Sequence, residues 1–236
     1  MKELAVRGKA CFHRSFFIVF LSCLVIFSPS SASASDDLQY WSSYNFTKKI
    51  GPGSRIIYEP ELRLRSDASD LYHHEHRVGV QQKLTDIYTL GVHYVTVRTQ
   101  KLSGIWQAEN RGELDLVGRW NWQTLRVSLR GRAELRYVEN DGKDELWRFR
   151  IRPHMAYPMK CGKIDVTPFI SDDVFYDADA GAWNQNRFYA GVTFPIKKEG
   201  ALAVNLDVYY MLENKRSAAG DWSANHVIGT KVFFLF

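Results

Sequence analysis

The chain has 236 residues, 45% of them hydrophobic and 14% aromatic, and a formal net charge of +5. This length fits a single domain. Outside the first 34 residues, 27 basic residues face 25 acidic ones, so the net charge gives no electrostatic basis for a nucleic-acid partner.

Residues 1–34 have the three-part pattern of a secretory signal peptide. A basic start is followed by an apolar run at 15–27 and by small residues around Ala32-Ser33-Ala34, where an exported chain is cut. We therefore expect residues 35–236 to form a single domain. Cys11 and Cys23 fall in the leader, which leaves Cys161 alone and excludes an intramolecular disulfide in the mature chain.

From Leu38 onward the chain alternates between apolar and polar side chains with a period of two. The segment 54–66 shows it best, with Ile56 and Leu62 on one face and Glu59 and Arg63 on the other, as in a strand. The expected strands are 38–48, 54–66, 74–84, 87–99, 107–120, 124–138, 144–157, 163–176, 183–194, 201–213 and 222–236.

Strands of roughly 11–15 residues exceed the usual soluble length of about 5–6 and suit tilted strands that cross a bilayer. The sequence thus predicts an all-β fold, an antiparallel up-and-down transmembrane β-barrel of about 10–12 strands. We count eleven, whereas bacterial single-chain barrels have even numbers. Ten and twelve therefore stay open, and an odd barrel would place the amino-terminus outside.

The last strand alternates up to Phe236 at the carboxy-terminus. Such a strand resembles the closing strand of bacterial outer-membrane barrels, in which a terminal aromatic residue is the signal read by the barrel-assembly machinery. The resemblance implies that machinery as a partner and Phe236 as the assembly signal.

The breaks between strands alternate between short turns and longer polar loops, as in outer-membrane barrels. The residues expected at the rim of the longer loops are the interface aromatics Trp106, Trp147, Trp183 and Trp222. Those expected at the opposite rim are Tyr88, Trp120, Trp122, Tyr157, Phe194 and Phe236. Two aromatic belts are typical of two membrane interfaces, so we expect outer-membrane lipid as a partner.

The charged residues share one face of each strand. A soluble barrel would turn this face to water and a membrane barrel would turn it inward; periodicity fits both. Leader, strand length and aromatic belts favour the membrane form, in which confined charges should pair. The expected lumen-facing charges are Glu59, Glu61, Arg63, Arg65, Glu75, Arg77, Glu109, Arg111, Glu113, Asp115, Arg130, Arg132, Glu134, Arg136, Arg148, Arg150 and Arg152.

The sequence contains few groups of residues that could bind a metal or catalyse a reaction, and none has a clear signature. In the run from His73 to His76, only His74 with His76, or His73 with Glu75, can share a face of a strand, so we favour a structural role over a metal site. A membrane-embedded hydrolase would need serine and histidine together. His226 with Ser223, and His154 with Ser128, have the residue types without a signature. We expect no catalytic residue, no metal and no cofactor.

Four segments, 41–46, 58–63, 72–77 and 147–150, resemble an uncharacterised "domain of unknown function" family of short exported proteins of Gram-negative bacteria. The resemblance implies an outer-membrane barrel and carries no catalytic residues. Our first hypothesis is a non-enzymatic outer-membrane protein, structural or a narrow conduit or binding site for a small polar solute. The alternatives are a membrane-embedded lipid-modifying enzyme and a soluble periplasmic barrel that binds an apolar ligand.

Overall fold

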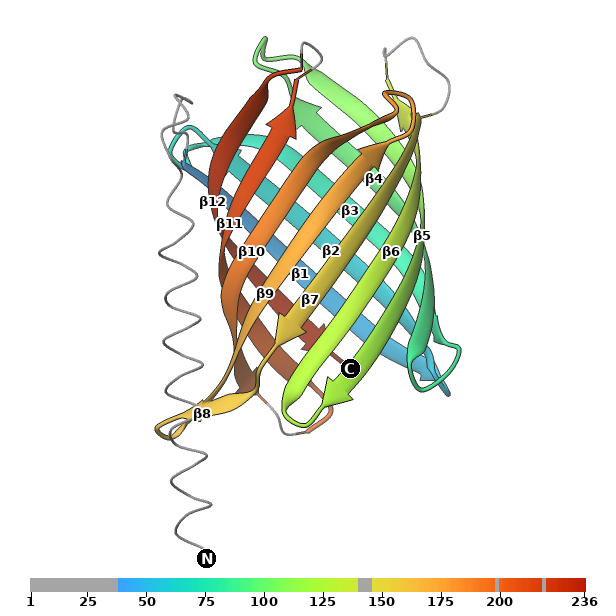
Figure 1. Ribbon diagram of the computed structural model, residues 1–236, viewed down its shortest axis with the longest axis vertical. Helices are drawn as coiled ribbons and strands as arrows, with labels where there is room; N and C mark the ends of the chain where they lie inside the picture. The colour runs from blue at the N-terminus through green and yellow to red at the C-terminus, as the bar shows by residue number, and fades with distance from the viewer. Residues whose placement is uncertain (1–37, 140–145, 198–199, 218–219) are drawn as a thin grey trace, which may run out of the picture. The chain divides into compact units, whose positions relative to one another are not determined.

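The computed structural model describes residues 38–139, 146–197, 200–217 and 220–236, which build a closed barrel of eleven strands plus one short extra strand (Figure 1). The predicted signal peptide lies outside these residues. No helix within them is long and apolar enough to cross a membrane. The strands are β1 (Leu38–Gly51), β2 (Ser54–Arg65), β3 (Asp70–Lys83), β4 (Tyr88–Gln100), β5 (Trp106–Trp122), β6 (Leu125–Val138), β7 (Leu146–Ala156), β8 (Met159–Cys161), β9 (Ile164–Asp177), β10 (Ala182–Lys197), β11 (Ala203–Arg216) and β12 (Trp222–Leu235).

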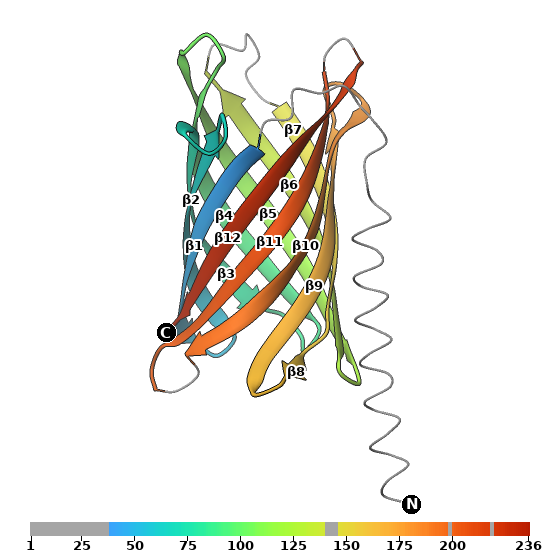
Figure 2. The same ribbon diagram turned by 90° about the vertical axis from the view of Figure 1, so that its left-hand side faces the viewer.

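The predicted all-β barrel is confirmed, and of the ten, eleven or twelve strands left open it has eleven. Neighbouring barrel strands are antiparallel except where β1 closes the sheet against β12 in parallel, from Leu38 opposite His226 to Thr47 opposite Leu235. An odd number of alternating strands makes this unavoidable, because the first and the last run in the same direction. Figure 2 shows β1 and β12 side by side. The additional strand β8 pairs only with the start of β9.

The two ends of the barrel can be named by their connections. We call the end where β2 turns into β3, β4 into β5 and β11 into β12 the loop end, and the opposite one the turn end. Leu38 starts at the loop end, whereas Gly51 and Leu235 lie at the turn end. The loops and turns differ less in length than expected, since residues 66–69 alone connect β2 to β3.

The third strand begins earlier than predicted because of a bulge. Arg63 faces His73 while the next residue, Leu64, faces Leu71, so Tyr72 is the extra residue. Its hydroxyl donates a 2.9 Å hydrogen bond to Gln39. A bulge shifts the alternation of side chains by one residue, so a prediction from strict alternation misses it.

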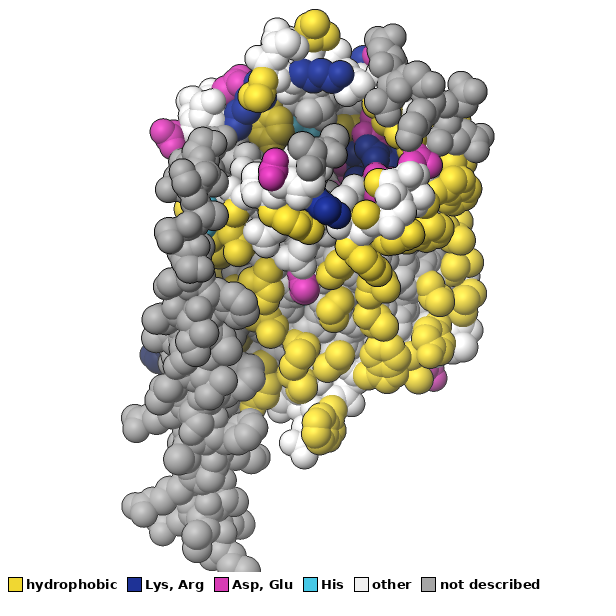
Figure 3. Space-filling model, turned by 45° about the horizontal axis from the view of Figure 1, so that its top comes forward, with side chains coloured by type: hydrophobic (Ala, Val, Ile, Leu, Met, Phe, Trp, Pro, Cys, Tyr) yellow, Lys and Arg dark blue, Asp and Glu magenta, His cyan; other side chains and the backbone are white. Residues whose placement is uncertain are grey.

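The outer wall is apolar. Side chains that alternate along β4 and β5 leave Val92 58% exposed and Leu114 50% exposed, while His93 and Glu113 beside them are buried. Figure 3 shows hydrophobic side chains over the visible wall and charged ones at the mouth of the loop end. Four tryptophans lie in the first or second position of strands that start at the loop end, and all are exposed: Trp106, Trp147, Trp183 and Trp222.

At the turn end the expected aromatic belt is only partly present. Tyr88, Trp120, Trp122 and Phe236 are exposed there, but Tyr157 is buried at 8% exposure. Its backbone N–H donates to the carbonyl of Pro168, which holds it against β9.

Part of the barrel interior is an apolar core that was not predicted. Trp41, Met211 and Val227 are fully buried and pack with Tyr189 and Tyr209. Tyr209 lies directly over Gly229 on β12, where any Cβ would overlap its ring. The interior is therefore packed with rings beside β1 and β10 to β12, and the charged groups occupy the rest.

Candidate functional site

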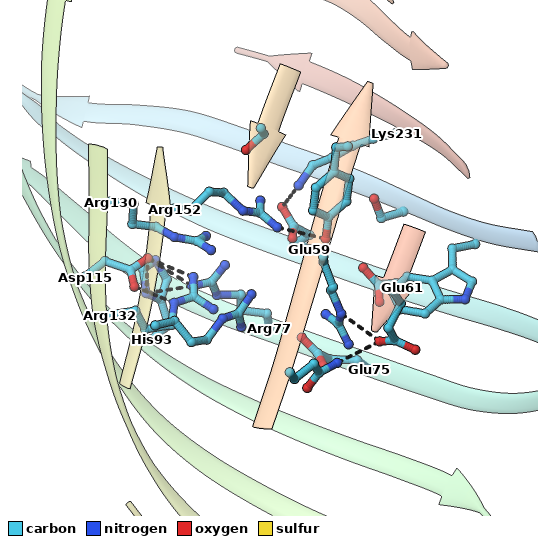
Figure 4. A pocket seen from close by; sticks show the side chains of 18 of the residues that line it. Glu59, Glu61, Glu75, Arg77, His93, Asp115, Arg130, Arg132, Arg152 and Lys231 are labelled. Atoms are coloured by element: carbon cyan, nitrogen blue, oxygen red, sulfur yellow. Dashed lines mark hydrogen bonds and ion pairs between the residues drawn. The ribbon is translucent and has the colours of Figure 1, made fainter. Parts of the chain in front are cut away.

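A polar cavity of about 670 Å³, here called the main cavity, occupies the barrel interior. Its lining extends from Asn184 and Arg216 at the loop end to Arg119 near the turn end. A second cavity of about 740 Å³ at the turn end shares Arg119, Ser128 and His154 with the first. Figure 4 shows labelled side chains from several strands converging in this space. The interior space thus reaches most of the way along the barrel.

Most of the charges expected in the lumen line this cavity. These are Glu59, Glu61, Arg63, Glu75, Arg77, Glu109, Arg111, Asp115, Arg130, Arg132, Arg136, Arg148, Arg150 and Arg152. Glu113 and Glu134 are not among its lining residues, and their side chains are 0% exposed. Arg65 pairs with Asp70 at 2.8 Å beside the loop that joins β2 to β3.

The largest cluster, here called the central arginine network, joins the inner faces of β3, β5, β6, β7 and β9. Its members are the arginines Arg77, Arg130, Arg132, Arg148, Arg150 and Arg152 and the carboxylates Glu113, Asp115, Glu134 and Asp173. Arg132 binds Asp115 through two hydrogen bonds of 2.6 and 2.9 Å. Such two-pronged pairs fix the guanidinium plane as well as the charge.

Glu134 is the hub between β6 and β7. It accepts hydrogen bonds from Arg148 at 2.6 Å and from Arg150 at 2.8 Å. Arg150 continues to Asp173, which also lies near Arg130 and Arg152. Removed from water, each of these charges depends on its partners for compensation.

The remaining ion pairs of the interior form smaller groups. Glu75, Arg111, Glu109 and Arg136 form a chain with contacts of 3.2, 2.5 and 2.5 Å. Three separate pairs join Arg63 to Glu61, Arg187 to Glu213 and Lys231 to Glu59 at 2.6 to 2.8 Å. Each of these groups contains as many carboxylates as basic side chains.

Several contributors to this interior were not among the predicted residues. Asp173, Arg187, Glu213, Lys231 and His93 all face inward. Asp173 could have been found from the alternation of β9, which also turns Phe175 and Ser171 inward. On the inner side of β1, the ring of Trp41 is contacted by two guanidinium groups, those of Arg63 and Arg187, at 3.7 and 4.9 Å from its centre. These distances are typical of cation–π partners.

The histidine run is divided between the two sides of the sheet. His73 faces inward with its Nε2 3.8 Å from Glu75, whereas the rings of His74 and His76 lie 5.8 Å apart on the outer side. Tyr58 and His76 share a 3.0 Å hydrogen bond there. Among the described residues, no group of three or more His, Cys, Asp or Glu side chains is placed to hold a metal ion.

The two serine–histidine pairs considered above are placed differently. Ser223 and His226 lie on opposite faces of β12, and the His226 ring bonds to the Tyr210 hydroxyl at 2.5 Å. Ser128 and His154 are cross-strand neighbours that line both cavities, yet no hydrogen bond joins them in the described part of the chain. His154 instead packs against Phe169, with ring centres 5.4 Å apart.

Comparison with known proteins identifies the family. A family model described as "Protein of unknown function (DUF2490)" matches residues 38–224. The chain belongs to this family. The match runs from the first residue of β1 into β12, so the DUF2490 region coincides with the barrel. A search of curated proteins finds no match.

Proposed function

We propose that this DUF2490 protein is an outer-membrane β-barrel of Gram-negative bacteria, without catalytic activity, whose polar interior binds or conducts a small polar solute. One observation carries the proposal: the charged side chains of the strands lie mostly inside the barrel, whereas its outer wall is apolar. That distribution is costly in water and favourable in lipid, where every backbone group of a closed sheet is also satisfied.

The dimensions and the rims support the same placement. Strands of 11 to 17 residues make up the eleven-stranded barrel, and a tilted strand needs about 9–11 residues to cross the hydrocarbon. Four exposed tryptophans mark the loop end, where amphipathic rings would meet the lipid headgroups. The two shortest connections, residues 52–53 and 123–124, lie at the turn end, and outer-membrane barrels have their short turns in the periplasm; the turn end is therefore assigned to the periplasm and the loop end to the cell exterior.

The interior argues for a narrow path rather than a wide pore. Packed rings occupy one side of it, ion pairs cross the rest, and the main cavity amounts to about 670 Å³. Volumes of this size are typical of small-molecule sites. A soluble barrel with an apolar ligand inside would need an apolar interior, and the cavity is lined mainly by charged and polar groups.

Isolated outer membranes test the placement. We expect the protein in this fraction, with a gel mobility that changes on boiling, because a folded barrel resists detergent until it is heated. Recovery in the soluble periplasm without such a shift would contradict the proposal.

Planar bilayers test conduction separately. Small, discrete currents are expected from a conduit, and an ion-tight bilayer would restrict the function to solute binding.

A further inference from the structure

The central arginine network differs from every other ion-pair group of the described interior in its charge. It joins six arginines to four carboxylates, so every arginine has a carboxylate within reach but the network carries a formal charge of +2. A buried charge that is not compensated strongly destabilises the folded state. An additional anion beside the network would therefore stabilise it.

The excess positive charge is concentrated around Asp173. Arg130, Arg150 and Arg152 all approach the same oxygen of this carboxylate, Oδ2, with Arg130 at 3.3 Å and Arg152 at 2.8 Å. The other oxygen, Oδ1, has no hydrogen-bond partner. One carboxylate thus has to serve three guanidinium groups, although Arg150 also reaches Glu134.

The strand register brings these arginines face to face, and each facing pair shares a single carboxylate, Asp173 or Glu134. Arg130 lies directly opposite Arg152, and Arg132 directly opposite Arg150, on the facing strands β6 and β7. Like charges directly opposite each other destabilise a sheet. Such an arrangement is favourable only when negative groups lie between or above the guanidinium planes.

The same side chains retain donors that no protein group uses. The Nε atoms of Arg130, Arg150 and Arg152 are buried and have no hydrogen-bond partner. Arg150 is the most enclosed of the three, with 9% of its side chain exposed. A guanidinium carries five N–H donors in a rigid fork that matches the oxygens of a phosphate or carboxylate.

Access to this position is through the main cavity. Arg130 and Arg152 line it and are 17% and 28% exposed, which makes them the reachable members of the trio. The hydroxyl of Tyr189 accepts a 2.9 Å hydrogen bond from Arg152, and the Tyr189 ring lies 4.7 Å below the guanidinium. Arg152 is thereby held in a fixed orientation toward the cavity.

We propose that Arg130 and Arg152, beside Asp173, bind a small doubly negative oxyanion of the phosphate type inside the barrel. Two negative charges match the excess of the network, and the exposed parts of the Arg130 and Arg152 guanidinium groups can donate to the oxyanion's oxygens. This inference rests on the proposed solute-binding function and specifies the class of solute. It does not depend on whether the solute passes through the barrel or stays bound.

Calorimetric titration of the purified, folded barrel with inorganic phosphate tests the site, with potassium chloride at equal ionic strength as the reference. We expect saturable binding of phosphate and none of chloride. Arg130→Gln and Arg152→Gln should each raise the dissociation constant for phosphate at least tenfold. Arg152→Lys should give an intermediate loss, because it keeps the charge and loses the fork. Arg98→Gln is the matched control, since Arg98 is 55% exposed and does not line the cavity; its phosphate affinity should be unchanged.

Absence of saturable phosphate binding, or equal binding by the parent protein and Arg152→Gln, would overturn the inference. Unfolding of Arg152→Gln would overturn it too, because removal of a surplus charge should be tolerated. Failure here is distinguishable from failure of the proposed function, because membrane fractionation and gel mobility report placement without reference to phosphate.

Discussion

At the scale of single residues, the structure depends most on its buried carboxylates. Glu134 and Asp173 are 0% exposed, and between them they contact Arg130, Arg148 and Arg150. Removing one partner of a buried ion pair is far more costly than removing both. Loss of a carboxylate also enlarges an existing excess of positive charge, whereas loss of an arginine reduces it.

Glu134→Gln should therefore lower the free energy of unfolding by about 3–5 kcal/mol, the usual cost of a broken buried pair. Urea unfolding of the barrel in lipid vesicles, followed by gel mobility, would measure it. Glu139→Gln is the control, because Glu139 is 53% exposed and pairs with Arg98 at the long distance of 3.9 Å. An exposed ion pair contributes about 1 kcal/mol or less to stability. Equal stability of the two variants would show that Glu134 is not the hub described here.

At the scale of elements, the contact that defines the barrel is the parallel seam between β12 and β1. The rings of Phe46 and Phe234 stack across it with centres 4.8 Å apart. Beyond the last residue of β12, the Phe236 backbone donates to Thr47 at 2.9 Å and accepts from Lys49 at 3.2 Å. The Phe236 ring itself is 52% exposed, so it contributes to the seam mainly through its backbone.

The backbone and the ring of Phe236 can be tested separately. Phe236→Ala keeps both backbone hydrogen bonds and should leave stability in vesicles within about 1 kcal/mol, since the ring is half exposed. In cells the same variant should reduce the amount of folded protein severalfold if the ring is read by the assembly machinery. Phe236→Tyr, which retains an aromatic ring, should behave as the parent protein does. Normal cellular levels of Phe236→Ala would contradict the assembly role.

The strands were predictable because alternation of side chains is a local property. Ten of the eleven barrel strands start within two residues of the predicted positions. The exception, β3, contains the bulge at Tyr72, whose hydroxyl donates a hydrogen bond to Gln39 on another strand. Contacts of this kind depend on the closed barrel and leave no local pattern.

The interior was predictable in part for the same reason. Charges that alternate strictly, such as Arg148, Arg150 and Arg152, were expected to share a face, and the structure places all three at the main cavity. The buried rings of Trp41 and Phe175 were not expected inside. An aromatic side chain suits either face of a membrane barrel, so only the three-dimensional packing decides its side.

At the scale of the whole molecule, the barrel has a charged interior and an apolar outer wall. Eleven strands with one parallel closure place Leu38 at the loop end and Leu235 at the turn end. With the turn end in the periplasm, as proposed, the first described residue lies at the outer side of the membrane. The ion-pair groups then cross the space that lipid cannot enter.

The most direct test of this account is an arginine placed on the outer wall. Leu114 lies at the middle of β5 and is 50% exposed, whereas Leu102, in the loop that follows β4, is 95% exposed. In lipid vesicles Leu114→Arg should lower the free energy of unfolding by about 2–4 kcal/mol, the cost of arginine at the bilayer midplane. Leu102→Arg should change it by less than about 0.5 kcal/mol. If Leu114→Arg proves as stable as the parent protein, the outer wall does not face hydrocarbon and the outer-membrane account is wrong.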